Sequence, residues 1–404
     1  MNWWLNKIRN SDETVDFKDY NPQYMESKTN TAVSKGIVDK TLSHAECNIL
    51  RGIAIAGIVL HNYCHWLRPI VKENEYQFNQ HNVDWFNNVM AHGFNDRTFF
   101  HLLSFFGHYG VPIFLFLSAY GLVAKYENAK PVSPSQNTST IHEPNTFRFL
   151  RYHWLKLFRM MIVGFSAFVL VDAITEGQHH YEVMDIVAQM GLFNNLLPNP
   201  DDIIWPGPYW FFGLMLQLYM VYRLFLYKKG WTWIVGFIAI CTLIQLSCEP
   251  NGEALNRWRY NFVGGMLPFG LGLLYAKYMR NIQLRIYGIT FIVSLLFIRF
   301  GSNNFLTWFF VPMFICSAGI SFVKLLTYWH EHFPQFTFGI AKTFEWLGVI
   351  SAALFISHPI TRKIIIPISR SGDYWTGLLL YMITSVCVAW LFKEIMRHVP
   401  SPKF

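Results

Sequence analysis

Charged residues are scarce in this chain, at 14% of its 404 residues, whereas an average soluble domain carries about 25%. Hydrophobic residues make up 52%, and apolar runs recur along nearly the whole chain after residue 48. A soluble enzyme with a single anchor is excluded, because such a chain would be polar over most of its length. The runs are continuous rather than alternating, which argues against a membrane β-barrel. The sequence predicts an all-α, polytopic helical bundle in a membrane.

Cysteine is also rare, and no two cysteines form a close metal-binding pair. Most of the six lie inside apolar segments, so we expect buried thiols and no metal site. They are Cys47, Cys64, Cys241, Cys248, Cys316 and Cys387. A cleavable signal peptide is not evident, because the N-terminal segment is polar and charged. We therefore expect the first spanning helix to act as its own insertion signal.

The apolar runs define about ten candidate spans, each near the ~20 residues that a helix needs to cross the hydrocarbon core. Their approximate limits are 49–67, 99–124, 149–172, 209–227, 231–248, 260–279, 284–300, 304–326, 341–361 and 374–397. They divide the chain into a polar tail at 1–47, a transmembrane domain at 48–397 and a short tail at 398–404. Trp3 and Trp4 are suited to anchor the first tail at the membrane interface.

The net charge of +8 indicates orientation rather than nucleic-acid binding, because basic residues gather on the cytoplasmic side of membrane proteins. With the N-terminus inside, roughly 24 of the 33 Lys and Arg residues fall on that side. The loop at 174–208 has no basic residue, whereas the segment 125–159 is rich in them. We expect an integral protein of the plasma membrane with both termini in the cytoplasm.

The first span carries ionisable groups that lipid should reject. On a helix with 100° per residue, Arg51, Asn62, His65 and His61 lie within about 100° of arc. The rise from Arg51 to His61 is about 15 Å, half the hydrocarbon thickness. Ionisable residues at this depth usually face the bundle interior and mark a functional site. The sequence predicts a cavity with Arg51 at its cytoplasmic mouth, although snorkelling of Arg51 and helix–helix hydrogen bonds of the histidines are the structural alternative.

Three later segments carry polar residues inside or beside apolar runs. Ser118 follows small residues that allow close helix packing, and packing alone would explain it. Arg148 and Arg151 share a helix face and suit phosphate binding, but they also fit the basic inner end of a helix. His358 precedes Pro359, which predicts a helix break with either an exposed polar group or a histidine that satisfies the broken backbone.

Taken in order, these segments resemble the membrane-bound acyltransferase 3 family over about residues 47–397. The matching residues are Arg51 and His61, Gly110-Val111-Pro112 with Phe114, Phe116, Ser118 and Tyr120, Arg148 with Arg151, Pro208-Tyr209-Trp210-Phe211-Phe212, and Gly348, Ser351 and His358-Pro359. The chain departs from the family pattern at two places. The family has ten residues between its arginine and histidine, whereas nine separate Arg51 and His61, and Asn62 stands at the expected position. The family's Ser-Gly is Ser118-Ala119 here.

The resemblance implies an enzyme, an acyltransferase that moves groups other than aminoacyl groups. The expected donor is cytoplasmic acyl-CoA, with acetyl-CoA favoured, and no metal is expected. The expected acceptor is a hydroxyl of an extracytoplasmic glycan or lipid-linked sugar, as in O-acetylation of a cell-envelope polysaccharide. The resemblance assigns the phosphates of CoA to Arg51, Arg148 and Arg151, with Lys156 nearby.

The reacting group implied by the resemblance is His61, as general base or as transient acyl carrier. The altered spacing leaves His65 and Asn62 as alternatives for this role. Trp210, Ser351 and His358, with Ser118, are expected to contact substrate or to support the site.

A transporter or channel is the competing class, because it would also place Arg and His on an interior helix face. The chain shows no internal repeat and few acidic residues in the middle of its spans, and both observations argue against that class. A structural assembly subunit would instead use the basic cluster to bind anionic lipid.

Overall fold

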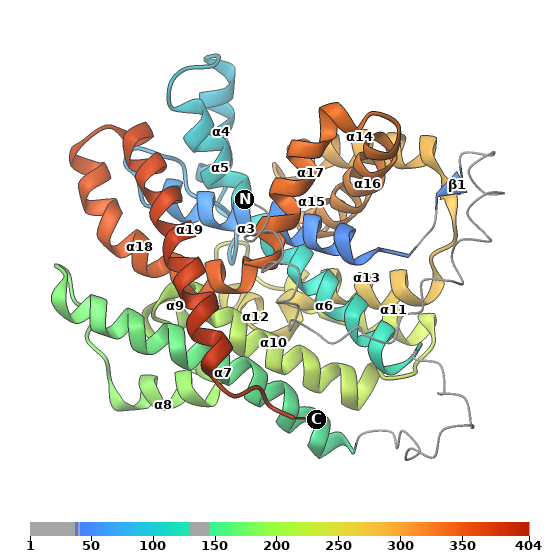
Figure 1. The fold of residues 1–404 in the computed structure, drawn as a ribbon, viewed down its shortest axis with the longest axis horizontal. Coiled ribbons are helices and arrows are strands. Elements are labelled where there is room, and N and C mark those ends of the chain that lie inside the picture. The colour runs from blue at the N-terminus through green and yellow to red at the C-terminus, as the bar shows by residue number, and fades with distance from the viewer. Residues whose placement is uncertain (1–36, 39–40, 129–144, 404) are drawn as a thin grey trace, which may run out of the picture.

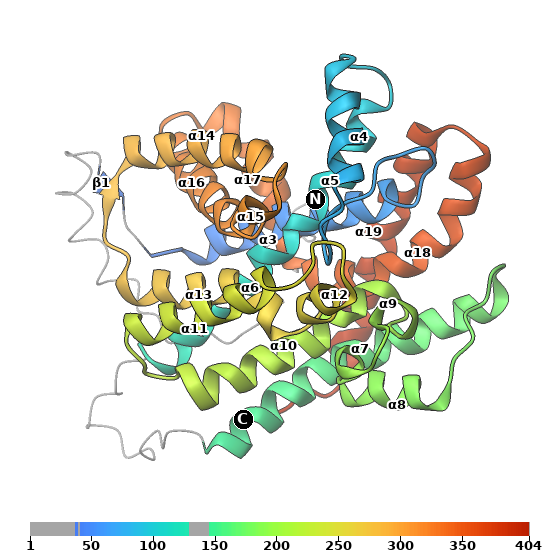
Figure 2. The same ribbon diagram turned by 180° about the vertical axis from the view of Figure 1, so that it is seen from behind.

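The computed structural model describes residues 37–38, 41–128 and 145–403. These residues form a bundle of helices (Figures 1 and 2), which confirms the predicted all-α membrane architecture. Their one strand pairing joins β1 (Ile37–Val38) to β2 (Ile282–Gln283) in antiparallel register. The predicted anchor at Trp3 and Trp4, with most of the predicted tail, lies outside the described residues.

The first half of the bundle contains four long helical segments and two long connections between them. In chain order its helices are α3 (His44–Cys64), α4 (Gln80–Ala91), α5 (Thr98–Phe106), η3 (Gly107–Tyr109), α6 (Gly110–Tyr126), α7 (Thr146–Ile174), α8 (Val183–Gly191), η4 (Asn194–Leu196), α9 (Pro200–Ile203), η5 (Gly207–Tyr209), α10 (Trp210–Val221) and the π-helical turn η6 (Tyr222–Leu226).

The second half adds the helices that flank α3 and α13. They are α11 (Trp231–Leu246), α12 (Glu253–Arg259), α13 (Phe262–Tyr278), α14 (Leu284–Gly301), α15 (Phe305–Trp308), α16 (Val311–His332), α17 (Pro334–Val349), α18 (Ser351–Ser371) and α19 (Tyr374–His398).

Within the described ranges, seven helical segments are long and apolar enough to cross a membrane. They are His44–Cys64, Thr98–Tyr126, Thr146–Ile174, Gly207–Leu226, Leu284–Gly301, Val311–His332 and Tyr374–His398. An eighth span results if α17 and α18, which bend by 77° at a short break, count as one. The two remaining predicted spans are the shorter helices α11 and α13, with 16 and 17 residues.

Helix α3 crosses the middle of the bundle in both ribbon views, between α17 on one side and α6 on the other (Figures 1 and 2). Glycines permit the contact with α17. A Cβ at Gly52 would collide with the backbone carbonyl of Phe344, and a Cβ at Gly348 would collide with that of Asn48. Such close approach of two backbones is the packing mode of membrane helices that lack a hydrophobic driving force.

The helix break near His358 lies at a different place from the predicted one. The chain bends at Ile350, between α17 and α18, and α18 then continues through Pro359. A proline removes one backbone hydrogen bond, and a buried helix tolerates this loss when neighbouring helices enclose it. The residues around Pro359 are buried, so the helix stays intact. The predicted break at Pro359 is therefore wrong, and Ser351 is the first residue after the real one.

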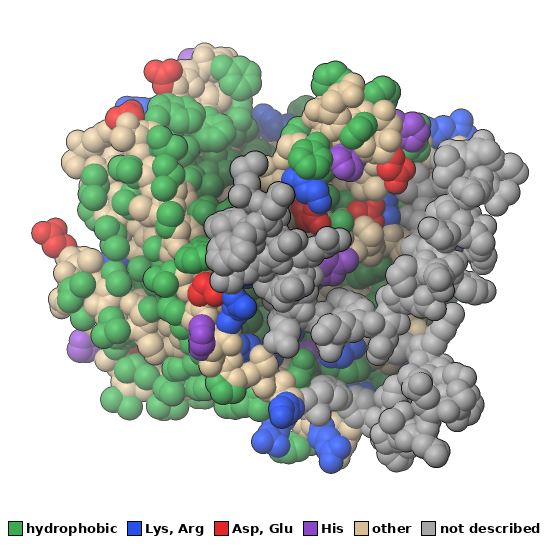
Figure 3. Space-filling view, viewed as in Figure 1, with side chains coloured by type: hydrophobic (Ala, Val, Ile, Leu, Met, Phe, Trp, Pro, Cys, Tyr) green, Lys and Arg blue, Asp and Glu red, His purple; other side chains and the backbone are tan. Residues whose placement is uncertain are grey.

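Large apolar side chains cover much of the surface, as Figure 3 shows for one face. Several helices expose such residues along their length, including Leu170 on α7, Ile240 on α11, Ile292 on α14 and Leu391 on α19. Exposed apolar area of this extent is rare on soluble monomers and is expected for helices that face lipid.

Candidate active site

The C-terminal end of α3 carries a cluster of two imidazoles and one carboxylate. His61 is buried, and its Nδ1 donates to the backbone carbonyl of Ser104 at 2.9 Å. The His65 ring lies 5.4 Å from the His61 ring, and His65 Nδ1 donates to Glu73 Oε2 at 2.5 Å. The predicted pair of histidines is thus present, and the segment after α3 adds an acidic partner that the sequence analysis missed.

A third imidazole completes the cluster from the second span. His108 is buried in the turn η3, 5.6 Å from the His61 ring, and neither of its ring nitrogens has a partner among the described residues. Glycines bring it there. A Cβ at Gly107 would collide with His61, and a Cβ at Gly110 would collide with the backbone of α3. Small residues therefore seat η3 against α3 and place His108 beside His61.

The cluster favours a negative charge on Glu73. Burial by itself would raise the pKa of Glu73, but the imidazoles of His65 and His61 hold that pKa well below its usual range. The possible ligand atoms of His61, His65 and Glu73 all lie within 4.8 Å of one another. This set is therefore also the place in the described chain where a metal ion could bind.

A small cleft, lined by apolar and aromatic residues with a few polar groups among them, opens beside this cluster at His108. Its lining includes His108, Glu75, Tyr76, Trp210 and Arg259. Burial and the charge of Glu73 raise the pKa of Glu75 to about 8, so this carboxyl is neutral at neutral pH. The Trp210 ring packs edge-on against Tyr76 at 5.5 Å. Trp210, which the sequence analysis named, therefore lies in the wall of the cleft.

Asn62 contacts a buried arginine that the sequence analysis did not single out, and His358 lies one turn before this arginine on α18. Arg362 on α18 donates from a guanidinium nitrogen to Asn62 Oδ1 at 2.6 Å, and its guanidinium lies 5.2 Å from the Trp66 ring. His358 is fully buried, and its Nδ1 donates to the Leu354 carbonyl at 3.0 Å. Its Nε2 has no partner in the described chain, and it lies within electrostatic range of both Arg362 and His61.

The predicted phosphate-binding residues lie toward the other end of α3. Arg51 is half-buried there, within electrostatic range of Lys156 on α7, and Lys125 from α6 approaches Lys156 as well. Arg148 and Arg151 are exposed on the first turns of α7. Lys156 therefore lies near Arg51, whereas Arg148 and Arg151 lie at the solvent-exposed start of α7.

Two predicted serines have local partners. Ser118 is half-buried on α6 and lies beside the hydroxyl of Tyr219. Ser351 is buried, and its Oγ donates to the Gly348 carbonyl at 2.8 Å. This bond caps the end of α17 at the bend, so Ser351 stabilises the break rather than facing the histidine cluster.

The order of motifs along the chain has a counterpart among known protein families. A family model described as an acyltransferase domain, that of the acyltransferase 3 family, matches residues 44–394. No match was found for the chain among curated proteins or among solved structures. The family match spans nearly all of the described helices, from the start of α3 almost to the end of α19. The chain therefore belongs to the acyltransferase 3 family and is a membrane acyltransferase.

Proposed function

We propose that this enzyme transfers an acyl group, with acetyl favoured, from cytoplasmic acyl-CoA to a hydroxyl of an extracytoplasmic glycan or lipid-linked acceptor. The observation that carries the proposal is the cluster of His61, His65 and Glu73 at the outer end of α3. The cluster places a base, His61, next to the charged pair of His65 and Glu73, and an aromatic-lined cleft lies beside it. Activation of a hydroxyl needs a base that is held in position in this way.

His61 is the proposed general base. Because its Nδ1 carries the proton that is donated to Ser104, Nε2 holds the free electron pair of the neutral ring. Nε2 takes the proton of the acceptor hydroxyl while the hydroxyl oxygen attacks the thioester carbonyl carbon. A C–O bond forms, the C–S bond breaks, and the proton passes from the imidazolium to the departing thiolate. Asn62 cannot serve as the base, because a carboxamide does not accept a proton at physiological pH.

His65 and Glu73 support this reaction through charge. The Glu73 carboxylate fixes the orientation of His65 through their 2.5 Å hydrogen bond. The pair then lies next to His61, where a positive charge develops as the imidazole takes up the proton. A fixed carboxylate near a developing imidazolium lowers the barrier in the same way as in catalytic triads.

The donor is proposed to enter from the inner end of α3. Arg51 and Lys156 would hold the phosphates of CoA, with Arg148 and Arg151 at the entrance. The thioester arm would then cover the rise of about 15 Å between Arg51 and His61. We retain the plasma membrane, with both termini in the cytoplasm, as the proposed location.

Acetyl transfer from labelled acetyl-CoA, measured in membrane vesicles with a hydroxyl acceptor, tests this assignment. We expect His61→Ala to lower kcat by at least ~100-fold, the usual contribution of a general base. His92→Ala is the matched control, because His92 is exposed at the end of α4. Wild-type vesicles without any transfer would overturn the proposed function, and full activity of His61→Ala would overturn the role of His61.

A further inference from the structure

Arg362 is a buried cation without a counter-charge. Arg362 is only 6% exposed, and it takes part in none of the ion pairs formed by the described residues. Burying a charge is costly unless an opposite charge accompanies it, and arginine cannot escape the cost by losing its proton. An unpaired buried guanidinium is therefore a site that is complete only when an anion binds.

The surroundings of Arg362 hold it in place but leave donors unused. Asn62 accepts one hydrogen bond from the guanidinium, and the Trp66 ring covers it at 5.2 Å. A guanidinium has five N–H donors, so most of its capacity is not used by Asn62. The Nε2 of His358, one turn before Arg362 on the same helix, is also buried and without a partner in the described chain.

The position of this group relative to His61 indicates which anion it would meet. Asn62 directly follows His61 on α3. The guanidinium is thus bound by the residue that directly follows the proposed base, and His358 is within electrostatic range of both groups. In an acyl transfer, negative charge develops on the carbonyl oxygen. This oxygen is bonded to the carbon that the activated hydroxyl attacks.

We propose that Arg362 stabilises the oxyanion of the tetrahedral intermediate, with Asn62 as the residue that positions it. The inference rests on the proposed acyl transfer at His61. When the acceptor oxygen bonds to the carbonyl carbon, the π electrons move to the carbonyl oxygen, and the Arg362 N–H groups hold that charge. The electrons return when the C–S bond breaks. Asn62 occupies the position at which the family has its histidine. In this chain, the residue at that position orients the Arg362 side chain instead.

The test compares Arg362→Met with the matched control Arg370→Met, since Arg370 is exposed on the same helix and donates to the Trp66 carbonyl. Loss of an oxyanion donor costs about 10²–10³ in kcat. We expect Arg362→Met to lose kcat by about that factor with little change in KM for acyl-CoA. Arg370→Met should stay near wild type.

Thermal unfolding of the same variants in detergent separates this role from a structural one. Replacing a buried, uncompensated cation by methionine removes a desolvation cost, so Arg362→Met should unfold at an equal or higher temperature while it loses activity. An arginine that only supports the fold would show the opposite, a lower unfolding temperature with kcat preserved in the folded fraction, and that result would overturn the proposal.

If Arg362→Met does not accumulate in the membrane, two milder variants test the proposed role of Arg362. Arg362→Lys keeps the charge but loses the planar donors, and Asn62→Ala frees the guanidinium. Both should lower kcat more than they change KM. Wild-type kcat in both variants would contradict the role of Arg362. Absence of transfer by the wild-type protein would contradict the proposed function itself, so the two failures are distinguishable.

Discussion

Two carboxyl groups, two residues apart, are held in opposite protonation states beside the cleft. The imidazoles of His65 and His61 keep the pKa of Glu73 low, whereas burial and the charge on Glu73 raise the pKa of Glu75 to about 8. At neutral pH one fixed negative charge, on Glu73, therefore lies near the cleft, and the wall of the cleft holds one carboxylic acid, Glu75, that can donate a hydrogen bond. Pairs of this kind divide acid and base roles in many active sites.

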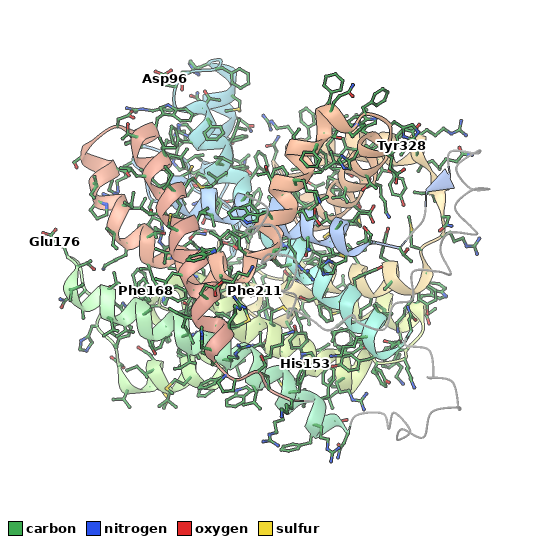
Figure 4. All side chains as sticks on the ribbon, viewed as in Figure 1. Asp96, His153, Phe168, Glu176, Phe211 and Tyr328 are labelled. Carbon is green, nitrogen blue, oxygen red and sulfur yellow. The ribbon has the colours of Figure 1, made fainter. Side chains whose placement is uncertain are left out.

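Replacing Glu73 should expose the contribution of its charge. Glu73→Gln keeps the size of the side chain but removes the charge that faces His65, so we expect kcat to fall by about 10²-fold, within the range for acid–base groups. The measurement is acetyl transfer in vesicles. Glu176→Gln is the control, since Glu176 is exposed at the far edge of the molecule (Figure 4).

The same assay distinguishes a proton-transfer cluster from a metal site. His61, His65 and Glu73 could bind a divalent cation, and a bound cation would occupy the electron pair that the general base needs. We expect transfer to persist after dialysis against a chelator. Activity that is lost on chelation and restored by a divalent cation would reassign the three residues as metal ligands.

Glu75 should make the stability of the protein depend on pH. Its pKa of about 8 in the folded protein lies above the ordinary value of about 4.3, so the folded state binds the extra proton between these values. Stability therefore falls as pH rises through this window, by up to ~1.4 kcal/mol per pH unit, and levels off above pH 8. Unfolding temperatures in detergent from pH 5 to 9 should fall less steeply for Glu75→Gln than for the wild-type protein. Equal slopes would contradict this assignment.

Residues on one helix were predictable, whereas residues joined by tertiary contacts were not. The shared face of Arg51, His61 and His65 follows from helical periodicity alone. Glu73 lies in an irregular connection, and Arg362 reaches Asn62 from a helix 300 positions later in the chain. No spacing rule links such positions, so the partner of each predicted residue became visible only in the folded structure.

At the scale of elements, the crossing of α3 and α17 sets the position of the cluster. Gly348→Ala would place a methyl group against the backbone of Asn48, which neither helix can accommodate without moving apart. We expect a loss of about 1–3 kcal/mol of stability, as for overpacked cores. Gly339→Ala is the control on the same helix, because a Cβ there meets nothing within 4 Å. Equal unfolding temperatures for the two variants would show that the crossing is not tight.

Hydropathy located the spans but could not show where they bend. The apolar run at 341–361 contains Pro359, and the sequence analysis placed the break there. The observed bend of 77° lies at Ile350, where Ser351 caps α17, while Pro359 lies inside α18. A helix breaks where its carbonyls find other partners, and a single sequence does not reveal those partners.

On the scale of the whole molecule, the proposed orientation, with the N-terminus in the cytoplasm, assigns each connection between spans to one side of the membrane. With the N-terminus inside, Asp96 and Glu176 belong to outer connections, and Tyr328 and His153 lie near the inner ends of α16 and α7. Figure 4 shows Asp96 at the upper left, Glu176 at the left edge, Tyr328 at the upper right and His153 below the centre. In this view the first pair lies on the left of the bundle, and the second pair lies to its right. The strand pairing of Ile37–Val38 with Ile282–Gln283 joins two segments that the proposed orientation assigns to the same, inner side.

Labelling of single introduced cysteines in intact cells tests this orientation. Glu176→Cys should react with a membrane-impermeant maleimide from outside, because Glu176 follows the end of α7 that the proposed orientation places outside. Arg280→Cys should react only after permeabilisation, since Arg280 is exposed in the connection before β2, which the proposed orientation places inside. The unsubstituted protein gives the background from its own cysteines, of which only Cys387 is exposed among the described residues. The reverse labelling pattern would show that the protein has the opposite orientation. The histidine cluster would then lie on the cytoplasmic side, and the proposal of an extracytoplasmic acceptor would lose its basis.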